Sequence, residues 1–314
     1  MILVVGATGV LGGEICRRLA IRGDHVRALV RPSSDPGRVR ALERLVTEIA
    51  PGDLRDAPSL GTACAGVDAV TTTASAVPHR FSAGRNDIAA VDLEGTMRLI
   101  DTARDAGIGH FVYVSLSGNL DPPCPLRDAK RDVERRLRAA GMRYTVVRPS
   151  AVMEAWLAPA AGFDYPRAIA TVDGAGDGPI SWIALGDLAE FSVRSLAAPA
   201  AWSTTLELGG PEAVTPLEVV RTFERASGRR FAVTHVPEEA LEGHEEAATD
   251  DMTRSIWALR RAGMRGDPIP MTGLLSAIPL ALTSVSQYAE RVLGKVPADA
   301  LMTRTPRSGR GPVC

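Results

Sequence analysis

Two hydrophobic patterns alternate through the first half of the chain. Short continuous apolar runs at residues 1–5 and 25–30 are typical of buried parallel strands, whereas residues 14–20 carry apolar side chains at helical spacing. Further strands are predicted at residues 46–50, 67–73, 109–114 and 144–148, and helices at 38–45, 93–106 and 127–138. Strands that alternate with helices predict an α/β fold: a Rossmann-type, doubly wound parallel sheet with helices on both faces.

A glycine-rich turn, VVGATGVLG, joins the first strand to the first helix. Gly6 permits a sharp turn, Gly9 permits close approach of backbone N–H groups to a pyrophosphate, and Gly12 permits close packing of helix and strand. The first helical turn also offers unpaired N–H groups and a positive dipole end. The predicted pyrophosphate-binding residues are Gly6, Thr8, Gly9, Val10, Leu11 and Gly12.

The residues after the next strands favour NADP(H) over NAD(H). Arg31 stands where an acidic side chain would bind the ribose diol of NAD, and it can pair with the 2′-phosphate of NADP, with a hydroxyl from Ser33 or Ser34. Asp53 and Leu54 are expected at the adenine edge, although Asp53 also suits a turn or a helix cap. Small residues after the fourth strand suit close cofactor approach, and these are Thr73, Ala74 and Ser75.

The second half of the chain predicts a smaller, mostly helical substrate lobe. We expect a nucleotide-binding domain at 1–150, to whose sheet 181–210 returns, a lobe formed by 151–180 and 211–302, and a disordered tail at 303–314. Within the lobe, residues 171–179 are expected to form a loop that acts as a lid. Later predictions are a strand at 181–184, a helix capped by Asp187, a strand at 230–236, and helices at 238–251, 252–262 and 278–293.

Composition narrows the classes of function. The net charge is −1, charged residues make up 23% and apolar residues 45%, as in a soluble globular protein, and no nucleic-acid surface is indicated. The four cysteines lack metal or disulfide spacing, so reduced thiols and no metal site are expected. No cleaved signal or membrane span is predicted. We therefore expect a cytoplasmic monomer or homodimer that acts on a small molecule.

Several ordered motifs together resemble a known family. GATGVLG, GDLRD, LEGTMRLIDTARDAGIGHFVYVSLSG, AKRDVERRLRAAGMRYTVVRPS and ISWIALGDLA are similar to the atypical short-chain dehydrogenase/reductases of the NmrA-like or isoflavone-reductase-like group, over residues 1 to about 210. The resemblance implies an NADPH-dependent oxidoreductase in which Ser117 and Lys130 are catalytic, with Lys130 also binding the nicotinamide ribose. Ser115 and Pro149 would border the cofactor. The implied substrate-binding segment holds Met153, Glu154 and Trp156, and Tyr165 is a further candidate for the substrate site.

One position departs from the family. The proton-donating tyrosine, four residues before Lys130, is replaced by Leu126, which cannot donate a proton. Lys130 or Ser117, directly or through a ribose hydroxyl or water, would then supply the proton during reduction of a carbonyl or activated alkene. Alternatively Tyr144 or Tyr165 enters the pocket. Two further alternatives remain open: a non-catalytic NADP-binding redox sensor of the NmrA type, and an epimerase or isomerase that retains its cofactor.

Overall fold

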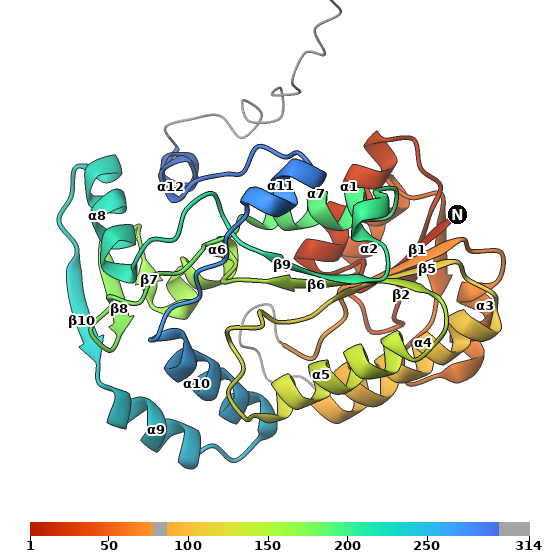
Figure 1. The fold of residues 1–314 in the computed structure, drawn as a ribbon, viewed down its shortest axis with the longest axis horizontal. Coiled ribbons are helices and arrows are strands. Elements are labelled where there is room, and N and C mark those ends of the chain that lie inside the picture. The colour runs from red at the N-terminus through yellow and green to blue at the C-terminus, as the bar shows by residue number, and fades with distance from the viewer. Residues whose placement is uncertain (78–86, 295–314) are drawn as a thin grey trace, which may run out of the picture.

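A parallel seven-stranded sheet forms the centre of the protein in the computed structural model, which describes residues 1–77 and 87–294 (Figure 1). Its strands are, in spatial order, β3 (Glu48–Pro51), β2 (Val26–Val30), β1 (Ile2–Val5), β4 (Ala69–Thr72), β5 (His110–Val114), β6 (Arg143–Pro149) and β9 (Thr204–Leu208). The order changes direction between β1 and β4, and ligands of such sheets bind outside the carboxyl ends of the strands at that point. The predicted doubly wound α/β fold is confirmed.

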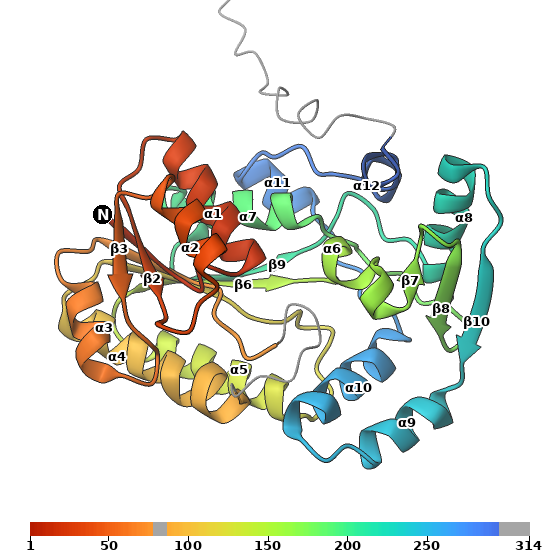
Figure 2. The same cartoon turned by 180° about the vertical axis from the view of Figure 1, so that it is seen from behind.

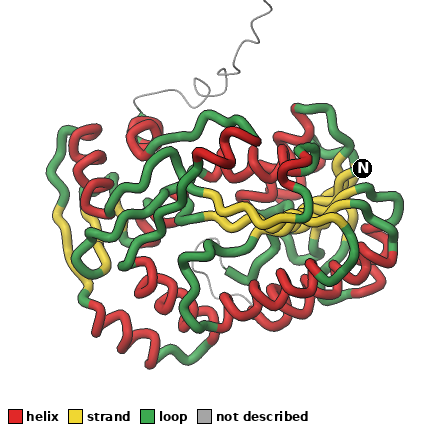
Figure 3. The backbone as a smooth tube through the Cα atoms, viewed as in Figure 1, coloured by secondary structure: helices red, strands yellow, loops and turns green. Residues whose placement is uncertain are grey.

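Helices cover both faces of this sheet (Figure 1). One face carries α1 (Val10–Ile21), α2 (Pro36–Glu43) and α7 (Leu185–Ser195). The other face carries α3 (Ala57–Cys64), the π-helix η1 (Ile88–Gly95), α4 (Thr96–Asp105) and α5 (Pro125–Arg138). The two hydrophobic cores lie between the sheet and these helix layers, and Figure 3 shows the strands as a band between them.

A second, smaller sheet organises the lobe at the carboxyl-terminal edge of the main sheet (Figure 2). In it β8 (Ile169–Asp173) pairs in parallel with β10 (Ala232–Val236) and antiparallel with β7 (Phe163–Asp164). The lobe helices are α6 (Met153–Trp156), α8 (Pro216–Ser227), α9 (Glu238–Glu246), α10 (Asp251–Gly263), α11 (Thr272–Ala277) and α12 (Val285–Val292), and short 3-10 turns are η2 (Pro159–Ala161) and η3 (Pro199–Ala201).

Aromatic packing and helix caps explain why the lobe folds as it does. Phe223 of α8 lies at the centre of its core, with its ring 4.8 Å from that of Phe163 and 6.3 Å from that of Tyr288. Thr215 and Glu218 form a capping box at the start of α8, which satisfies backbone N–H groups that would otherwise lack partners. The sequence therefore determines where α8, the helix that carries the central aromatic residue, begins.

The two parts of the molecule meet along α5 and α10. Leu126 and Ala129 of α5 are buried against Ala258 and Leu259 of α10. Because α10 also lines the lobe's cavity, described below, this contact fixes the distance between the main sheet and that cavity. Figure 1 shows α9 and α10 running from the lobe toward α5 beneath the sheet.

Several local predictions are wrong. Residues 171–173, predicted to begin the lid loop at 171–179, belong to β8, because they gain backbone partners on β10 that the sequence does not reveal. Residues 181–184 form no strand, and only Ile183 among them makes an isolated bridge, to Val152. The helix expected at 278–293 is confined to α12, since Ser284 caps it. The tail predicted at 303–314 lies outside the described residues.

Candidate functional site

The glycine turn is packed so tightly that two of its glycines are required by the protein itself. Gly6 has a φ of +85°, and a Cβ there would lie 2.8 Å from Thr73 Oγ1. A Cβ on Gly12 would lie 2.2 Å from the carbonyl oxygen of Gly6. These contacts hold the turn against the loop that follows β4.

Gly9, by contrast, is exposed and begins α1. As the N-cap of this twelve-residue helix, it provides no side-chain cap, and the first turn contains no acidic residue. The N-terminal N–H groups of α1 are therefore not blocked by side chains and can bind an anion. Val10 is also exposed and Leu11 half-buried. This open helix end fits the pyrophosphate of a dinucleotide.

Charged side chains surround the predicted adenosine end. Arg31 is half-buried just after β2, and Ser33 is exposed on the same loop. Arg38 of α2, which the sequence analysis missed, donates from Nη1 to the carbonyl oxygen of Thr8 at 2.9 Å. The missed signal was a basic residue in the first turn of the helix after Arg31, although only the fold shows that it reaches the glycine turn.

The Asp53 carboxylate is engaged by a neighbour within its own loop. It receives two hydrogen bonds from Arg55, at 2.9 and 2.7 Å, and these lower the pKa of Asp53. Leu54 is buried, and its Cβ would lie 2.8 Å from a Cβ on Gly95. Asp53 is thus held within its own loop and Leu54 packs against η1, and their place at the adenine edge stays a prediction.

The loops expected around the nicotinamide leave three adjacent strands. Thr73 follows β4, Ser115 follows β5, and Pro149 ends β6, and these strands are neighbours in the sheet. The Thr73 N–H donates to the carbonyl oxygen of Val5, 3.0 Å away, so this loop is tied to β1. Ala74 and Ser75 continue it toward the end of η1.

The two serines after β5 point to different partners. Ser115 Oγ donates to Glu134 Oε1 at 2.6 Å, and this buried carboxylate also accepts hydrogen bonds from Arg131, Arg138 and Arg148. Ser117 Oγ donates to Asp267 Oδ1 at 2.7 Å. Both hydroxyl hydrogens are therefore directed to carboxylates of the protein. Ser117 is the serine that faces the lobe.

Lys130 is buried in an ion pair. Its Nζ lies 3.1 Å from Asp92 Oδ1 and 5.2 Å from the centre of the Tyr113 ring. Burial disfavours the ammonium, but Tyr113 and Asp92 outweigh it and raise the pKa of Lys130. Asp92 Oδ2 also accepts a hydrogen bond of 2.8 Å from the Ala76 N–H, so the pair is joined to the loop after β4. Lys130 is a permanent cation beneath the predicted nicotinamide site.

Leu126, at the position of the family's tyrosine, is 2% exposed and packs in the cluster between α5 and α10. Its backbone N–H also contacts that helix, because it donates a hydrogen bond to Ser255 Oγ at 3.1 Å. The position is occupied by the contact between the two parts of the molecule.

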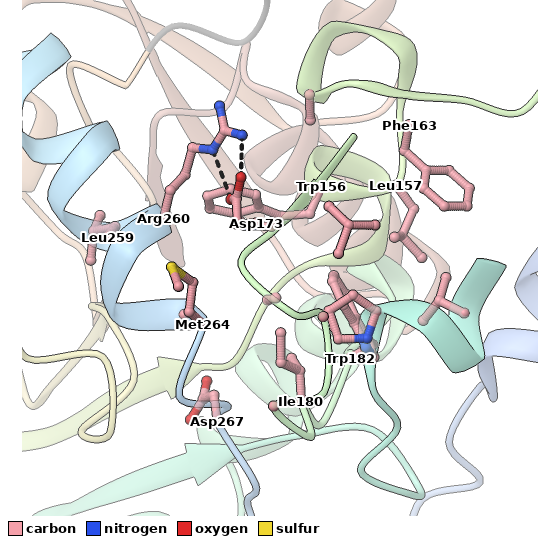
Figure 4. Close-up of a pocket in the computed structure, with 18 of the residues that line it drawn as sticks. Trp156, Leu157, Phe163, Asp173, Ile180, Trp182, Leu259, Arg260, Met264 and Asp267 are labelled. Carbon is pink, nitrogen blue, oxygen red and sulfur yellow. Dashed lines mark hydrogen bonds and ion pairs between the residues drawn. The ribbon is translucent and has the colours of Figure 1, made fainter. Parts of the chain in front are cut away.

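A largely apolar cavity of about 110 Å³ lies beside these strand ends (Figure 4). Trp156, Trp182, Ile180 and Met264 contribute to its walls. Its charged groups are Asp267 and the pair Asp173–Arg260, which makes two hydrogen bonds of 2.9 and 2.5 Å. Ala151, two residues after β6, also lines it, so the cavity adjoins the predicted nicotinamide end.

Of the four expected substrate residues, the structure brings Trp156 alone to this cavity's lining. Met153 is fully buried, and Tyr165 packs with its ring 5.8 Å from that of Phe223. Glu154 accepts hydrogen bonds from the Leu185 N–H and from Arg291, each 2.8 Å, so it caps α7. The four-residue helix α6 turns these side chains to different faces, which the sequence did not show.

The described part of the chain, residues 1–77 and 87–294, includes no helix long and apolar enough to cross a membrane.

Fold and site together define a Rossmann-type protein with an open dinucleotide-binding turn and a separate apolar cavity at the strand ends. The chain belongs to the NmrA-like family, whose model matches residues 1–271. The resemblance found in the sequence is thereby confirmed.

Individual relatives differ in what they do. An NAD(P)H azoreductase of Xenophilus azovorans is 28% identical over 89% of this chain and 92% of its own. The photosystem II assembly factor Ycf39 of Synechocystis is 25% identical over 94% of this chain and 91% of its own. Among solved structures, the NADPH-dependent quinone oxidoreductase QOR2 of Escherichia coli, complexed with NADPH, has a TM-score of 0.75 at 21% identity and covers 93% of this chain and 100% of its own.

Proposed function

We propose that the protein is an NADPH-dependent reductase that acts on a carbonyl or conjugated double bond of a small apolar substrate. The observation that carries this proposal is the position of the apolar cavity beside the strand ends that lead from the open glycine turn. The similarity of the chain to an azoreductase and to a quinone oxidoreductase supports the proposal. A bound NADPH would supply the hydride for such a reduction.

The chain's own residues would hold the two ends of this cofactor. The N–H groups at the start of α1 would bind the pyrophosphate, and Arg31 would pair with the 2′-phosphate. Arg38 would hold the glycine turn through its bond to Thr8. The Lys130 ammonium would place a positive charge near the nicotinamide ribose, and its ion pair with Asp92 would hold the ammonium in position.

A non-catalytic NADP-binding protein is the second candidate, and Leu126 favours it. The family's proton donor is missing, and the structure uses that position for packing between α5 and α10. The assembly-factor relative also shows that membership of this kind is compatible with another role.

Calorimetric titration of the full chain with NADPH, NADP and NADH tests cofactor binding. Replacing Arg31→Ala should weaken NADPH about tenfold more than NADH, because only NADPH carries the 2′-phosphate. Arg38→Ala should weaken both dinucleotides, since it loosens the glycine turn. Arg40→Ala is the matched control on the exposed side of α2 and should change neither.

Oxidation of NADPH with a panel of quinones, azo dyes and aldehydes then separates the two candidates. Turnover with a member of the panel supports the reductase. Tight NADPH binding without oxidation by any of them favours the non-catalytic protein, and absence of dinucleotide binding contradicts both.

A further inference from the structure

Asp267 has an unusual environment for a carboxylate. Its side chain is 0% exposed, yet it lies on the wall of the apolar cavity (Figure 4). Oδ1 accepts hydrogen bonds from Ser117 Oγ at 2.7 Å and from Asn119 Nδ2 at 2.9 Å. Oδ2 is buried without a hydrogen-bond partner in the described residues. One oxygen is therefore satisfied by the protein, whereas the other has no donor among the described residues.

The backbone holds this carboxylate rigidly. The Asp267 N–H donates to the carbonyl oxygen of Pro179 at 2.8 Å, and its carbonyl oxygen accepts from the Ser181 N–H at 3.0 Å. Gly266 precedes it with a φ of +87°, and a Cβ there would lie 2.5 Å from the Pro179 carbonyl oxygen. The backbone of Asp267 is therefore fixed, and turning its carboxylate would break the Oδ1 bonds to Ser117 and Asn119.

The other charged groups of the cavity, Asp173 and Arg260, satisfy each other. Asp173 and Arg260 form a two-point ion pair, and the indole N–H of Trp182 donates to the Val214 carbonyl oxygen at 3.0 Å. A carboxylate oxygen buried among apolar side chains costs free energy until a donor reaches it. The cavity thus offers one strong acceptor in an apolar space.

We infer that this cavity binds an apolar, ring-sized group carrying an N–H or O–H donor, and that Asp267 Oδ2 accepts the hydrogen bond from that donor. A dry cavity of about 150 Å³ takes benzene in another protein, so a volume of about 110 Å³ suits a five-membered ring or a similar head group. In the proposed reductase this ring-sized group would be part of the substrate. Only its role in turnover rests on the proposed function.

Pyrrole and furan provide a matched pair of probes. They have nearly the same size and shape, but only pyrrole has an N–H donor. Binding to the full chain is followed without cofactor by NMR at the indole N–H signals of Trp156 and Trp182, which line the cavity. Pyrrole should bind with a dissociation constant about tenfold below that of furan, as expected for a hydrogen bond to a carboxylate.

Asp267→Asn should bring the two constants within about twofold of each other, because its amide can keep accepting from Ser117 and Asn119 while presenting N–H to the cavity. Asp121→Asn is the control, since Asp121 pairs with Arg131 outside the cavity, and it should retain the tenfold preference. Equal binding of both probes to the unmodified protein, no binding of either, or a preference that persists in Asp267→Asn would each overturn the inference. If Asp267→Asn does not fold, the comparison in the unmodified protein still decides.

NADPH binding, measured separately, distinguishes this inference from the proposed function. Pyrrole preference in a protein that neither binds nor oxidises NADPH would remove the reductase and keep the site. NADPH oxidation without any pyrrole preference would keep the reductase and remove the proposed donor-binding site.

Discussion

Asp187 provides a quantitative test of how the C-terminal segment is attached to the nucleotide-binding part. It lies in the first turn of α7 but does not cap that helix as predicted, because its carboxylate accepts hydrogen bonds from the Thr283 N–H at 2.7 Å and the Thr283 hydroxyl at 3.2 Å. Burial raises the pKa of Asp187 from 3.8 to about 6, against the effect of the Thr283 bonds and of Arg18, and Glu154 adds to the rise.

The sign of the pH effect follows from this rise. The folded state binds a proton at Asp187 more tightly than the unfolded state, so the contribution of Asp187 to stability is fully present below about pH 4 and is lost as the pH rises through 6. At about 1.4 kcal/mol for each pH unit, the loss is about 3 kcal/mol. Asp187→Asn keeps the shape of the neutral acid, with an oxygen for the Thr283 N–H and an amide that can donate to its hydroxyl.

Urea unfolding followed by tryptophan fluorescence, at pH 4, 5, 6 and 7.5, measures the difference between Asp187→Asn and the unmodified protein. The two should have equal free energies of unfolding near pH 4, and the variant should be more stable by about 3 kcal/mol at pH 7.5. Asp105→Asn, at an exposed position, is the control and should show no such trend. A difference that is constant with pH, or of opposite sign, would refute the reasoning.

Three further changes test other parts of the structure. Burial lowers the pKa of His110 to about 4, so His110 should reduce the free energy of unfolding by about 3 kcal/mol as the pH falls from 6.5 to 4. His110→Gln keeps a donor for Thr145 and should remove this pH dependence in the same unfolding experiment. Leu126→Tyr should not restore a proton donor but should overpack the α5–α10 contact, lowering stability by about 1–3 kcal/mol in thermal unfolding, and an unchanged melting temperature would contradict this. A Cβ would lie 3.0 Å from the Gly6 carbonyl oxygen at Gly9 but 2.2 Å from it at Gly12, so Gly12→Ala should lower the melting temperature more than Gly9→Ala. Gly9→Ala should mainly weaken NADPH binding, and equal stability of the two variants would count against the packing argument.

Local patterns were sufficient to predict the architecture of the main sheet. Continuous apolar runs and helical spacing depend on neighbours in the sequence, and the turn from Gly6 to Gly12 is a local motif, so the parallel sheet and the site at its switch point could be deduced before any contact was known. Arg31 could be placed for the same reason, since it directly follows the second strand.

Contacts between distant residues decided the rest. Asp267 meets Ser117 across 150 positions, Arg38 meets Thr8 across 30, and neither contact leaves a periodic signal in the chain. The last three residues of the lobe's β8, 171–173, were predicted as loop because the partner strand, β10, lies about sixty residues later. By itself the sequence determined the fold and predicted where a dinucleotide would bind, since both follow from local backbone preferences. Only the tertiary structure decided which carboxylate faces the cavity, because that depends on how packing brings remote segments together.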